Sequence, residues 1–554
     1  MSQAEMTEMN PDEITPADSD VRTTFPTRQP HIRWKLGLSL FTIGAGLETL
    51  IGNAFSEDGS AFVFLSMIIL STTAFLLLLW WTFLSGFAWK TRGIGLAAVG
   101  LFVVVWFSVF RVDGYYGQMW PIISYRWELT PDEKLAAFLK DQTAADNPEA
   151  VSVDDAVTTI TATQQDWPQF RGPNRDGIVT NANLRIDWNS NPPQQVWRHP
   201  VGLGWSSFAI VGDYAFTQEQ RKAEECVVCY NALTGKQVWV YQNNDWFTES
   251  MGGDGPRATP TFHESKLYTL GATGILNCLN AADGKKIWSR NILDDASAAG
   301  VPVKNIGWAM AGSPLVSDGM VFVNPGGKQG RGVIAYDVLS GDIVWAKGND
   351  PASYCAPRIE TVDGVRQLLI YDGFGLKGHD IATGKELWRT EWKTQPEVVA
   401  AQPIVQDGNY IFLSAGYTVG STLIKVRHTK NGWQVDTKNV LKNKFKLKFN
   451  DGLYKAGYVY GLSEGILACF DFKTGQRMWK RGRYNYGQLL LVGDHILVQA
   501  ESGEVALVEA NPKAFKEVAR FQAITGKTWN HPVLHRGKLY LRNAQEAACY
   551  DVGK

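Results

Sequence analysis

The stretch Cys229-Tyr230-Asn231-Ala232-Leu233-Thr234-Gly235-Lys236, followed by Trp239, is the clearest copy of a pattern that recurs along this chain. In each clear copy, Asp or Asn is followed by a turn that ends in Gly, and Trp stands four residues after that Gly. The further copies place these two residues at Gly284 and Trp288, Gly341 and Trp345, Gly384 and Trp388, and Gly475 and Trp479. The first four copies lie roughly 40 to 57 residues apart, close to the period of about 40 to 50 residues that β-propeller blades show.

Two short alternating runs joined by a turn precede each copy, as in Thr259–His263 and Lys266–Leu270. This arrangement predicts four strands per blade, with the Gly turn joining the third strand to the fourth. We expect the Gly to supply a positive φ in that turn. We expect the Trp to lie on the outer strand, where its ring packs over the next blade and its N–H reaches a carbonyl.

Two weaker copies fill the gaps in the series. Ser421–Val426, Asn431-Gly432 and a strand toward Val440 form the fifth blade. Gln488–Ala510 and Phe515–Phe521 form the seventh.

The last blade is split between the two ends of the domain. Its first three strands are His531–Arg536, Lys538–Arg542 and Ala547–Asp551, and the missing fourth is the upstream run Gln194–Arg198. Such closure removes the unpaired sheet edge that an open ring would expose. The sequence therefore predicts an all-β, eight-bladed β-propeller over residues 166–554.

Three apolar runs precede the propeller: Lys35–Asn53, Ala61–Leu84 and Gly93–Phe110. Each approaches the length of about 20 residues that a helix needs to cross a bilayer, so we expect three transmembrane helices in residues 34–111. Basic residues flank the first run on its N-terminal side and occupy the loop between the second and third runs. By the positive-inside rule, the N-terminus is cytoplasmic and everything after Phe110 is exported across a bacterial cytoplasmic membrane to the periplasmic side. These basic residues are Arg22, Arg28, Arg33, Lys35, Lys90 and Arg92.

The segments around the spans carry weaker patterns. Residues 1–33 are acidic and poor in aromatics, which predicts a disordered cytoplasmic tail. Residues 112–165 are expected to form a juxtamembrane helix, capped at Thr130, and a linker. Tyr115, Tyr116 and Trp120 follow the third span at once, as an interfacial aromatic belt would.

The repeat resembles the tryptophan-docking repeat of pyrroloquinoline-quinone (PQQ) dehydrogenases and of the outer-membrane assembly lipoprotein BamB. Three further stretches, Trp167–Gly177, Gly255–Thr261 and Gly312–Val316, are similar to the PQQ-binding-like propeller proteins common in planctomycetes. The resemblance covers about residues 166–552. It implies a quinoprotein-like fold and leaves the activity open.

The resemblance also implies what a PQQ site would require. In the dehydrogenases the quinone lies over the channel, between a Trp and a disulfide of adjacent cysteines, with calcium on acidic and Asn ligands and an Asp as base. None of the six cysteines of this chain are adjacent, and Cys226 and Cys229 would point to opposite faces of a strand. Asp451 beside Asn450 is a single carboxylate–amide pair, which is little for a calcium site. We therefore assign no metal site and no cofactor, and PQQ with calcium remains the cofactor of the alternative function.

Candidate ligand-binding residues are those near the start of each innermost strand, because these positions surround the mouth of the central channel. Aromatic, guanidinium, amide and carboxylate groups in such a ring could hold a planar anion or a peptide. The alternative for each residue is that it caps a strand or fills the channel mouth. The candidates are Trp205, Arg257, Thr259, Trp308, Ser313, Gln402, Asn450, Asp451, Trp529 and His531.

An alternating run of lysines and apolar residues extends from Lys442 to Phe449. A stripe that binds phosphate or lipid is one interpretation. The favoured one is the solvated face of a half-buried strand.

Two functions remain. The first is a binding or scaffolding module whose longer top-face loops, Gln242–Pro256 and Asn291–Ala311, dock a protein or polymer, while the three helices bind the lipid bilayer. The alternative is a membrane-bound PQQ-dependent dehydrogenase that oxidises alcohols or sugars. The cysteine pattern and the poor calcium ligands favour the first function. A formal net charge of -1 gives no reason to expect a nucleic-acid partner.

Overall fold

The computed structural model describes residues 32–54, 59–145, 159–180, 183–297, 301–394, 397–417, 419–438 and 445–554. The chain divides into two compact units. The first holds Met1–Ala54 and Leu65–Phe107, and the second holds Phe55–Phe64 and Ser108–Lys554. The predicted tail lies outside the described residues except for its last two positions.

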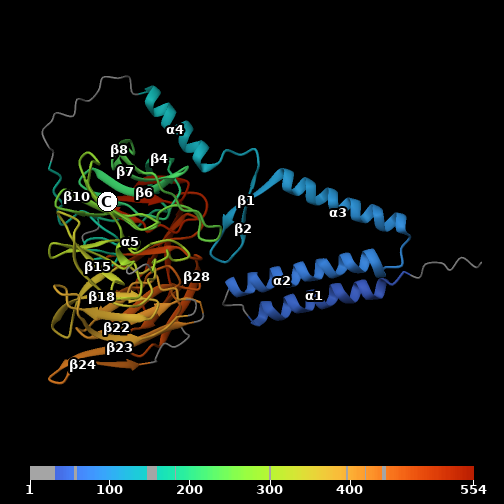
Figure 1. Ribbon diagram of the computed structural model, residues 1–554. Helices are drawn as coiled ribbons and strands as arrows, with labels where there is room; N and C mark the ends of the chain where they lie inside the picture. The colour runs from blue at the N-terminus through green and yellow to red at the C-terminus, as the bar shows by residue number, and fades with distance from the viewer. Residues whose placement is uncertain are drawn as a thin grey trace, which may run out of the picture. The chain divides into compact units, whose positions relative to one another are not determined.

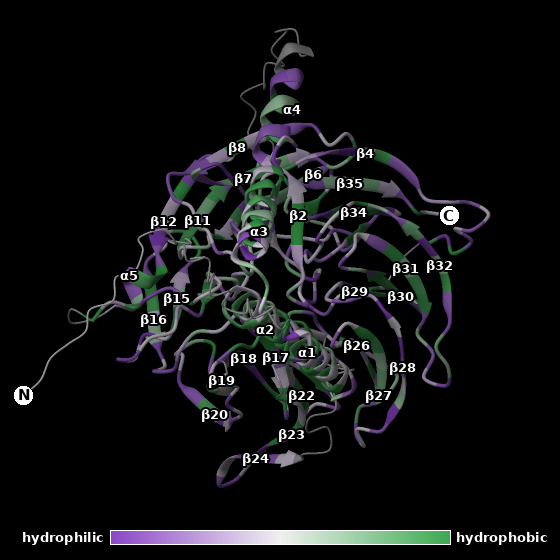
Figure 2. Ribbon diagram, turned by 90° about the vertical axis from the view of Figure 1, so that its right-hand side faces the viewer, coloured by the Kyte–Doolittle hydropathy of each residue, from purple (hydrophilic) through white to green (hydrophobic). Residues whose placement is uncertain are grey.

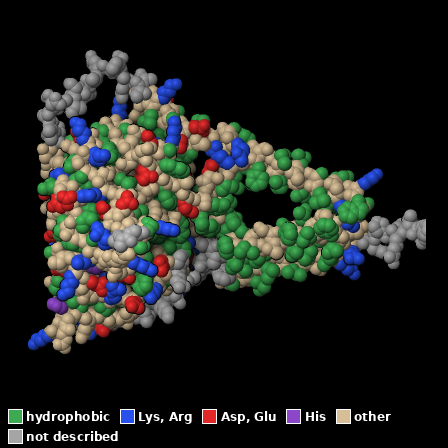
Figure 3. Space-filling view, viewed as in Figure 1, with side chains coloured by type: hydrophobic (Ala, Val, Ile, Leu, Met, Phe, Trp, Pro, Cys, Tyr) green, Lys and Arg blue, Asp and Glu red, His purple; other side chains and the backbone are tan. Residues whose placement is uncertain are grey.

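The first unit is built from the predicted apolar helices. They are α1 (Trp34–Ala54), α2 (Gly59–Leu79), the π-helix η1 (Trp80–Leu84) and α3 (Trp89–Val109). Three spans in this region are long and apolar enough to cross a membrane, namely Trp34–Ala54, Phe62–Leu84 and Trp89–Val109. Hydrophobic side chains dominate the surface of these helices, whereas charged side chains are scattered over the propeller (Figure 3). The expectation of three apolar helices ahead of the propeller is confirmed.

The second unit begins with a hairpin that the sequence interpretation did not foresee. Strands β1 (Phe110–Tyr115) and β2 (Pro121–Tyr125) pair antiparallel. The helix α4 (Pro131–Ala145) follows. Thr130 caps its N-terminus: the Thr130 amide donates to Glu133 Oε2 over 2.7 Å, and the Glu133 amide donates to Thr130 Oγ1 over 3.3 Å.

The rest of the second unit is a ring of eight sheets around a central axis (Figures 1 and 2). Each sheet is antiparallel except where the short strand β3 (Ile178–Val179) joins the seventh, and successive strands run outward from the axis. The first four blades are β5–β8 (Ala209–Val211, Tyr214–Arg221, Glu224–Asn231, Gln237–Asn243), β9–β12 (Thr261–His263, Lys266–Leu270, Ile275–Asn280, Lys286–Asn291), β13–β16 (Leu315–Ser317, Met320–Val323, Val333–Asp337, Ile343–Lys347) and β17–β20 (Arg358–Val362, Val365–Asp372, Gly375–His379, Glu386–Glu391). The next three are β21–β24 (Ile404–Gln406, Tyr410–Ala415, Gly420–Thr429, Gly432–Lys438), β25–β28 (Leu453–Lys455, Tyr458–Ser463, Ile466–Asp471, Arg477–Arg483) and β29–β32 (Gln488–Val492, His495–Gln499, Glu504–Glu509, Glu517–Gln522). A short helix, α5 (Ile292–Ala296), follows β12.

The eighth blade is split, as the sequence predicts. It combines β33 (Val533–His535), β34 (Lys538–Arg542) and β35 (Glu546–Asp551) with β4 (Gln194–Pro200) as the outermost strand. Cys549 lies opposite Trp197 in this register. Helix α4 packs on β4, where the rings of Phe138 and His199 stack with centroids 5.0 Å apart. The ring therefore closes, and its closing edge strand is covered.

The repeated Trp docks one blade onto its neighbour. The indole N–H of Trp239 donates to the Ala281 carbonyl over 3.1 Å, and its ring lies against Gly284 so closely that a Cβ there would be 2.5 Å from Trp239 Cε3. The same pairing joins Trp197 to Gly235, Trp288 to Gly341 and Trp345 to Gly384. Each of these glycines has a φ near +70°, so the turn and the docking both require a residue without a side chain.

The series of Trp–Gly docking contacts is interrupted after the fourth blade, and the sequence explains why. The fifth blade lacks the Gly–Trp repeat, and Trp388 donates instead to Gln367 Oε1 of its own blade over 2.6 Å. The series resumes with Trp479, which donates to the Asn511 carbonyl in the seventh blade. The ring nevertheless stays closed at this weak repeat.

The motif Trp167–Gly177 crosses the ring and ties blades together. Its first residues reach the first two blades, where Trp167 exchanges backbone hydrogen bonds with Ile210 and the Pro168 carbonyl accepts from Phe262. Its later residues reach the seventh blade, where the Gly177 carbonyl accepts from Leu491 and the following strand β3 (Ile178–Val179) pairs parallel with β29. The motif therefore serves as a structural clamp inside the ring.

Candidate functional site

An axial cavity of about 630 Å³ opens where the innermost strands begin. Seven of the ten predicted candidates line it: Trp205, Arg257, Thr259, Trp308, Asp451, Trp529 and His531. The structure thus brings candidates from five blades around one cavity, although they are spread along the sequence from Trp205 to His531. Both predicted top-face loops contribute to its wall, through Met251 and Gly252 in one and Trp308 and Ala311 in the other.

Ser313, Gln402 and Asn450 do not line the cavity. The Ser313 hydroxyl accepts from the Thr259 amide over 2.9 Å, and the Asn450 side-chain amide donates to the Leu462 carbonyl over 2.9 Å. The Gln402 backbone amide donates to Asp451 Oδ1 over 2.6 Å. All three residues are buried between blades, so for them the alternative of a structural polar residue fits the geometry.

Asp451 sits at the centre of a buried ionic cluster. Its Oδ2 lies 3.0 Å from His531 Nε2 and 3.4 Å from Arg171 Nε, and all three side chains are largely shielded from solvent. Burial alone would raise the pKa of Asp451, but the Arg171 charge and the His531 hydrogen bond leave that pKa below its usual value. Burial lowers the pKa of His531 despite its carboxylate partner. Asp451 is therefore an ionised, fully engaged carboxylate.

Aromatic rings and Lys448 form another part of the wall, and Lys527 packs against two of these rings. Lys527 Nζ lies 4.8 Å from the ring centroid of Trp205 and 4.2 Å from that of Trp529, a close cation–π arrangement. Burial lowers the pKa of Lys527 to about 8. Lys448 is likewise buried, over the rings of Tyr417 and Tyr486.

Lys448 corrects the interpretation of the lysine run. The described part of that run, residues 445–449, forms no strand, and Phe445, Leu447 and Lys448 are all buried. Its favoured interpretation as a solvated strand face is wrong there, because Lys448 turns inward to the aromatic rings of the cavity. Lys442 and Lys444 lie outside the described residues.

The mouth of the cavity is partly occupied by the turn of the β1–β2 hairpin. Tyr116, Gly117 and Met119 line the cavity, and the Met119 amide donates to the Tyr116 carbonyl over 2.8 Å in a four-residue turn. The Gly117 amide donates to Glu501 Oε1 over 2.6 Å, and Lys527 Nζ donates to the Tyr115 carbonyl over 3.0 Å. Tyr116, which the sequence places in an interfacial belt, thus lines the cavity of the propeller. The sequence signal that could have found the hairpin is the alternating run Pro121–Tyr125 after a glycine between aromatic residues.

Glu501 binds the turn of the hairpin, and the sequence patterns did not identify it. It follows the second strand of the seventh blade and is 1% exposed. The Trp529 indole N–H donates to Oε1 of this carboxylate over 2.8 Å, alongside Gly117. Burial raises the pKa of Glu501 in spite of these two donors.

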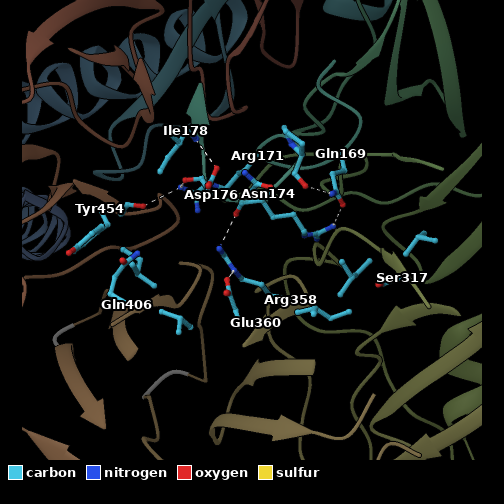
Figure 4. Close-up of a pocket in the computed structure, with 18 residues that line it drawn as sticks. Gln169, Arg171, Asn174, Asp176, Ile178, Ser317, Arg358, Glu360, Gln406 and Tyr454 are labelled. Atoms are coloured by element: carbon cyan, nitrogen blue, oxygen red, sulfur yellow. Dashed lines mark hydrogen bonds and ion pairs between the residues drawn. The ribbon is translucent and has the colours of Figure 1, made fainter. Parts of the chain in front are cut away.

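A second hollow of about 530 Å³ lies further along the innermost strands (Figure 4). The axial cavity is lined by residues that precede β17 and β25, such as Tyr354 and Asp451, whereas the second hollow is lined by Ile359 and Tyr454 within those strands. The clamp motif separates the two spaces: Phe170 faces the axial cavity and the residues around it face the second hollow. Arg358 donates to the Arg175 carbonyl there over 2.9 Å.

The donors around the axial cavity do not fit PQQ with calcium. A calcium ion would have to displace the buried Arg171 guanidinium and His531 from Asp451. The other buried carboxylate of the wall, Glu464, accepts from the Tyr486 hydroxyl over 2.8 Å. Among the described residues, no group of three or more His, Cys, Asp or Glu side chains is placed to hold a metal ion. All six cysteines are free and buried, and none are adjacent, so a disulfide of neighbouring cysteines cannot form one face of a quinone site.

Comparisons with known proteins agree with the fold. A family model described as outer membrane protein assembly factor BamB matches residues 223–481. BamB of Burkholderia pseudomallei (strain K96243) is 22% identical over 358 residues, which cover 60% of this chain and 84% of that protein. Quinohemoprotein alcohol dehydrogenase ADH-IIG of Pseudomonas putida is 32% identical over 148 residues, which cover 24% of this chain and 19% of the dehydrogenase.

Among solved structures, BamB from Moraxella catarrhalis has a TM-score of 0.46 at 16% identity, with 65% of this chain and 99% of that chain covered. Quinohemoprotein alcohol dehydrogenase from Comamonas testosteroni has a TM-score of 0.49 at 13% identity, with 76% and 84% covered. The family match falls within the eight-bladed propeller region of the chain. The chain therefore contains an eight-bladed β-propeller, and its residues 223–481 match the BamB family model.

Proposed function

We propose that this chain is a membrane-anchored binding module whose axial cavity receives a polypeptide segment of a partner protein. One observation carries the proposal: the mouth of an aromatic-walled cavity accommodates a turn of the chain's own backbone. A cavity that binds main-chain groups in this way suits a scaffold better than a redox centre.

The state of the charged groups supports binding over chemistry. A general base must be able to take up a proton from a substrate near neutral pH. Asp451 is held ionised by Arg171 and His531, and Glu464 and Glu501 accept hydrogen bonds from the chain's own donors. Each carboxylate therefore has a structural role.

The rim of the cavity offers apolar surface for a protein partner. Met251, in the predicted top-face loop, lines the cavity and is 41% exposed, and Trp246 in the same loop is 52% exposed. Exposed aromatic and methionine side chains beside a concave site are typical of protein interfaces. The partner proposed here is thus a protein segment that reaches the cavity between the two long loops.

The distribution of basic residues supports a proposal for the compartment. Arginines and lysines precede the first span and lie between the second and third, while Glu57 and Asp58 occupy the first loop. We propose that the N-terminus is cytoplasmic and that the propeller lies on the periplasmic side of the cytoplasmic membrane. The module would then act on partners at the outer face of that membrane.

Selection from displayed peptides tests the proposal. The full chain in lipid nanodiscs is panned against a library of random 12-residue peptides, and the enriched peptides are titrated against variants. Trp308→Ala removes a ring from the cavity wall, and we expect a loss of at least about 2 kcal/mol in binding, or about thirtyfold. Trp433→Ala is the matched control, because Trp433 lies in β24 against His428 and outside the cavity.

The proposal is supported if enriched peptides bind the native chain and the Trp433→Ala variant alike and bind Trp308→Ala much more weakly. It is overturned if no peptide is enriched. It is equally overturned if all three proteins bind the enriched peptides with the same affinity.

A further inference from the structure

We propose that the axial cavity is a receptor for a glycine-containing β-turn, and that the turn Tyr116–Met119 is its resident ligand. A partner protein would bind by replacing this turn with its own. The inference rests on the proposed function, since it specifies the polypeptide segment that the binding module recognises.

The first step is that the turn is recognised mainly through its backbone. Glu501 accepts from the Gly117 amide, and Lys527 donates to the Tyr115 carbonyl. The side chain of Gln118 also contributes, because its amide donates to Asn485 Oδ1 over 3.1 Å. Recognition of an amide and a carbonyl by opposite charges selects a backbone conformation and leaves most side chains free to vary.

The second step is that the receptor excludes any side chain at the position of Gly117. A Cβ built on Gly117 would collide with the Tyr486 ring and lie 2.9 Å from Glu501 Oε1. The φ of Gly117 is outside the positive range that favours glycine, so its own backbone conformation does not require this residue. The close contact with Tyr486 and Glu501 does require a glycine at this position.

The third step is that the receptor groups are held by the propeller itself. The Trp529 indole anchors Glu501, and the Trp205 and Trp529 rings hold Lys527. Tyr486, which forms the steric wall, is held by Glu464. A site whose groups are fixed before the ligand arrives loses little conformational entropy on binding.

The fourth step is that the resident turn leaves the cavity largely empty. About 630 Å³ remains next to Tyr116 and Met119. Gln488 also faces this space; it is 2% exposed, and its Oε1 accepts no hydrogen bond from the described residues. A partner turn that carries a Trp or Tyr beyond its glycine would fill this volume and supply the missing donor.

Tethering explains how a modest resident ligand can occupy the site. The hairpin belongs to the same chain, so its effective concentration at the cavity is set by the chain connection and not by diffusion. A partner must therefore outcompete an intramolecular ligand. The resident turn keeps the site closed to weak, unspecific peptides.

The test uses the full chain in nanodiscs and a fluorescent peptide of residues 110–125, cyclised through added terminal cysteines. Gly117→Val expels the resident turn, so we expect this variant to bind the peptide at least about tenfold more tightly than the native chain does. A peptide with the same Gly→Val change should bind neither protein. Val112→Ala is the matched control, because Val112 lies on the same hairpin, is 53% exposed and does not touch the cavity.

A second measurement uses the native chain, so that misfolding of the Gly117→Val variant would not decide the outcome. Hydrogen exchange at residues 115–119 should be slow in the native chain and should accelerate when excess cyclic peptide displaces the turn. Equal peptide binding by the native and Gly117→Val chains, or exchange that the peptide leaves unchanged, overturns the inference. If selected peptides bind through Trp308 while the cyclic turn does not, the turn inference fails and the proposed function stands. If neither binds, both fail.

Discussion

The amide of Gly117 donates to Oε1 of Glu501 over 2.6 Å, although 384 positions of sequence separate these two residues. The bond joins the segment that follows the last apolar helix to the seventh blade, close to the axis of the ring. It is buried, and burial together with the charge of Glu501 raises the pKa of the neighbouring Tyr116 hydroxyl. A buried bond to a carboxylate is among the stronger hydrogen bonds in proteins, so it fixes where the hairpin docks.

The glycines that contact a docking Trp should contribute more to the free energy of unfolding than glycines in similar turns without that contact. Gly284 and Gly319 both have a φ of +73°, but a Cβ on Gly284 would meet Trp239 and a Cβ on Gly319 would meet nothing within 4 Å. Gly319→Ala should cost about 1–2 kcal/mol from the left-handed backbone alone. Gly284→Ala should cost about 1–3 kcal/mol more, because it also overpacks the docking contact. Chemical denaturation of the two variants measures the difference, and equal losses would contradict the docking role of Trp239.

The pairing of Asp451 with Arg171 predicts strong coupling between them. Asp451→Asn leaves the Arg171 guanidinium buried without its carboxylate, which should destabilise the chain by about 3–5 kcal/mol. Arg171→Met in the same chain removes the unpaired charge. The double variant should therefore lose less than the sum of the two single variants, by at least about 1 kcal/mol. Additive losses would show that the two groups do not interact.

Lys527 predicts a pH dependence with a definite sign. Burial lowers its pKa from 10.5 to about 8, so between these pH values the unfolded chain binds more protons at this site than the folded chain does. The free energy of unfolding should therefore gain a contribution as pH rises through this window, with no such gain below pH 8. The urea midpoint of the native chain, relative to that of Lys527→Met, should rise between about pH 7.5 and pH 9.5.

Lys473→Met provides the control for this titration. Its ion pair with Asp407, at 2.7 Å, raises the pKa of Lys473, so this lysine does not titrate in the window. The difference between the native chain and Lys473→Met should stay constant with pH. A constant difference for Lys527→Met as well would mean that Lys527 is not buried as a charged group beside Trp205 and Trp529.

The proposed topology predicts opposite behaviour of two reporter fusions. Alkaline phosphatase fused after Phe110 should be active, because this site is proposed to be exported, and a fusion within the loop that contains Lys90 should be inactive. Green fluorescent protein at the same two sites should give the reverse pattern. Fluorescence of the fusion after Phe110 would place the propeller in the cytoplasm.

The ring was predictable because its determinants are local and repeated. Each Gly–Trp pair lies within four residues, and the strand runs around it alternate with a period of two. Even the split blade follows from counting strands, since three C-terminal strands need a fourth. The exception at Trp388 follows from the weak fifth repeat.

The site was predictable only in part. Position near the start of an inner strand identified Trp205, Arg257 and Asp451, but it could not tell a side chain that faces the cavity from one that bonds to the surrounding protein. Ser313 accepts from the Thr259 amide ahead of the second blade, and Asn450 donates to a carbonyl of its own blade. Gly117 and Glu501 were missed because their contact spans most of the chain, and no local pattern reports which distant turn will dock in a cavity.

Equilibrium dialysis of the purified full chain against PQQ and Ca²⁺ separates a polypeptide-binding cavity from a quinoprotein site. The cavity has no adjacent cysteines to cover the quinone, and its buried Asp451 is already bound by Arg171 and His531. We therefore expect no stoichiometric retention of quinone and no dye reduction when alcohols or sugars are added. One PQQ retained per chain, with alcohol- or sugar-dependent dye reduction, would contradict the binding-module function and support the alternative function of a PQQ-dependent dehydrogenase.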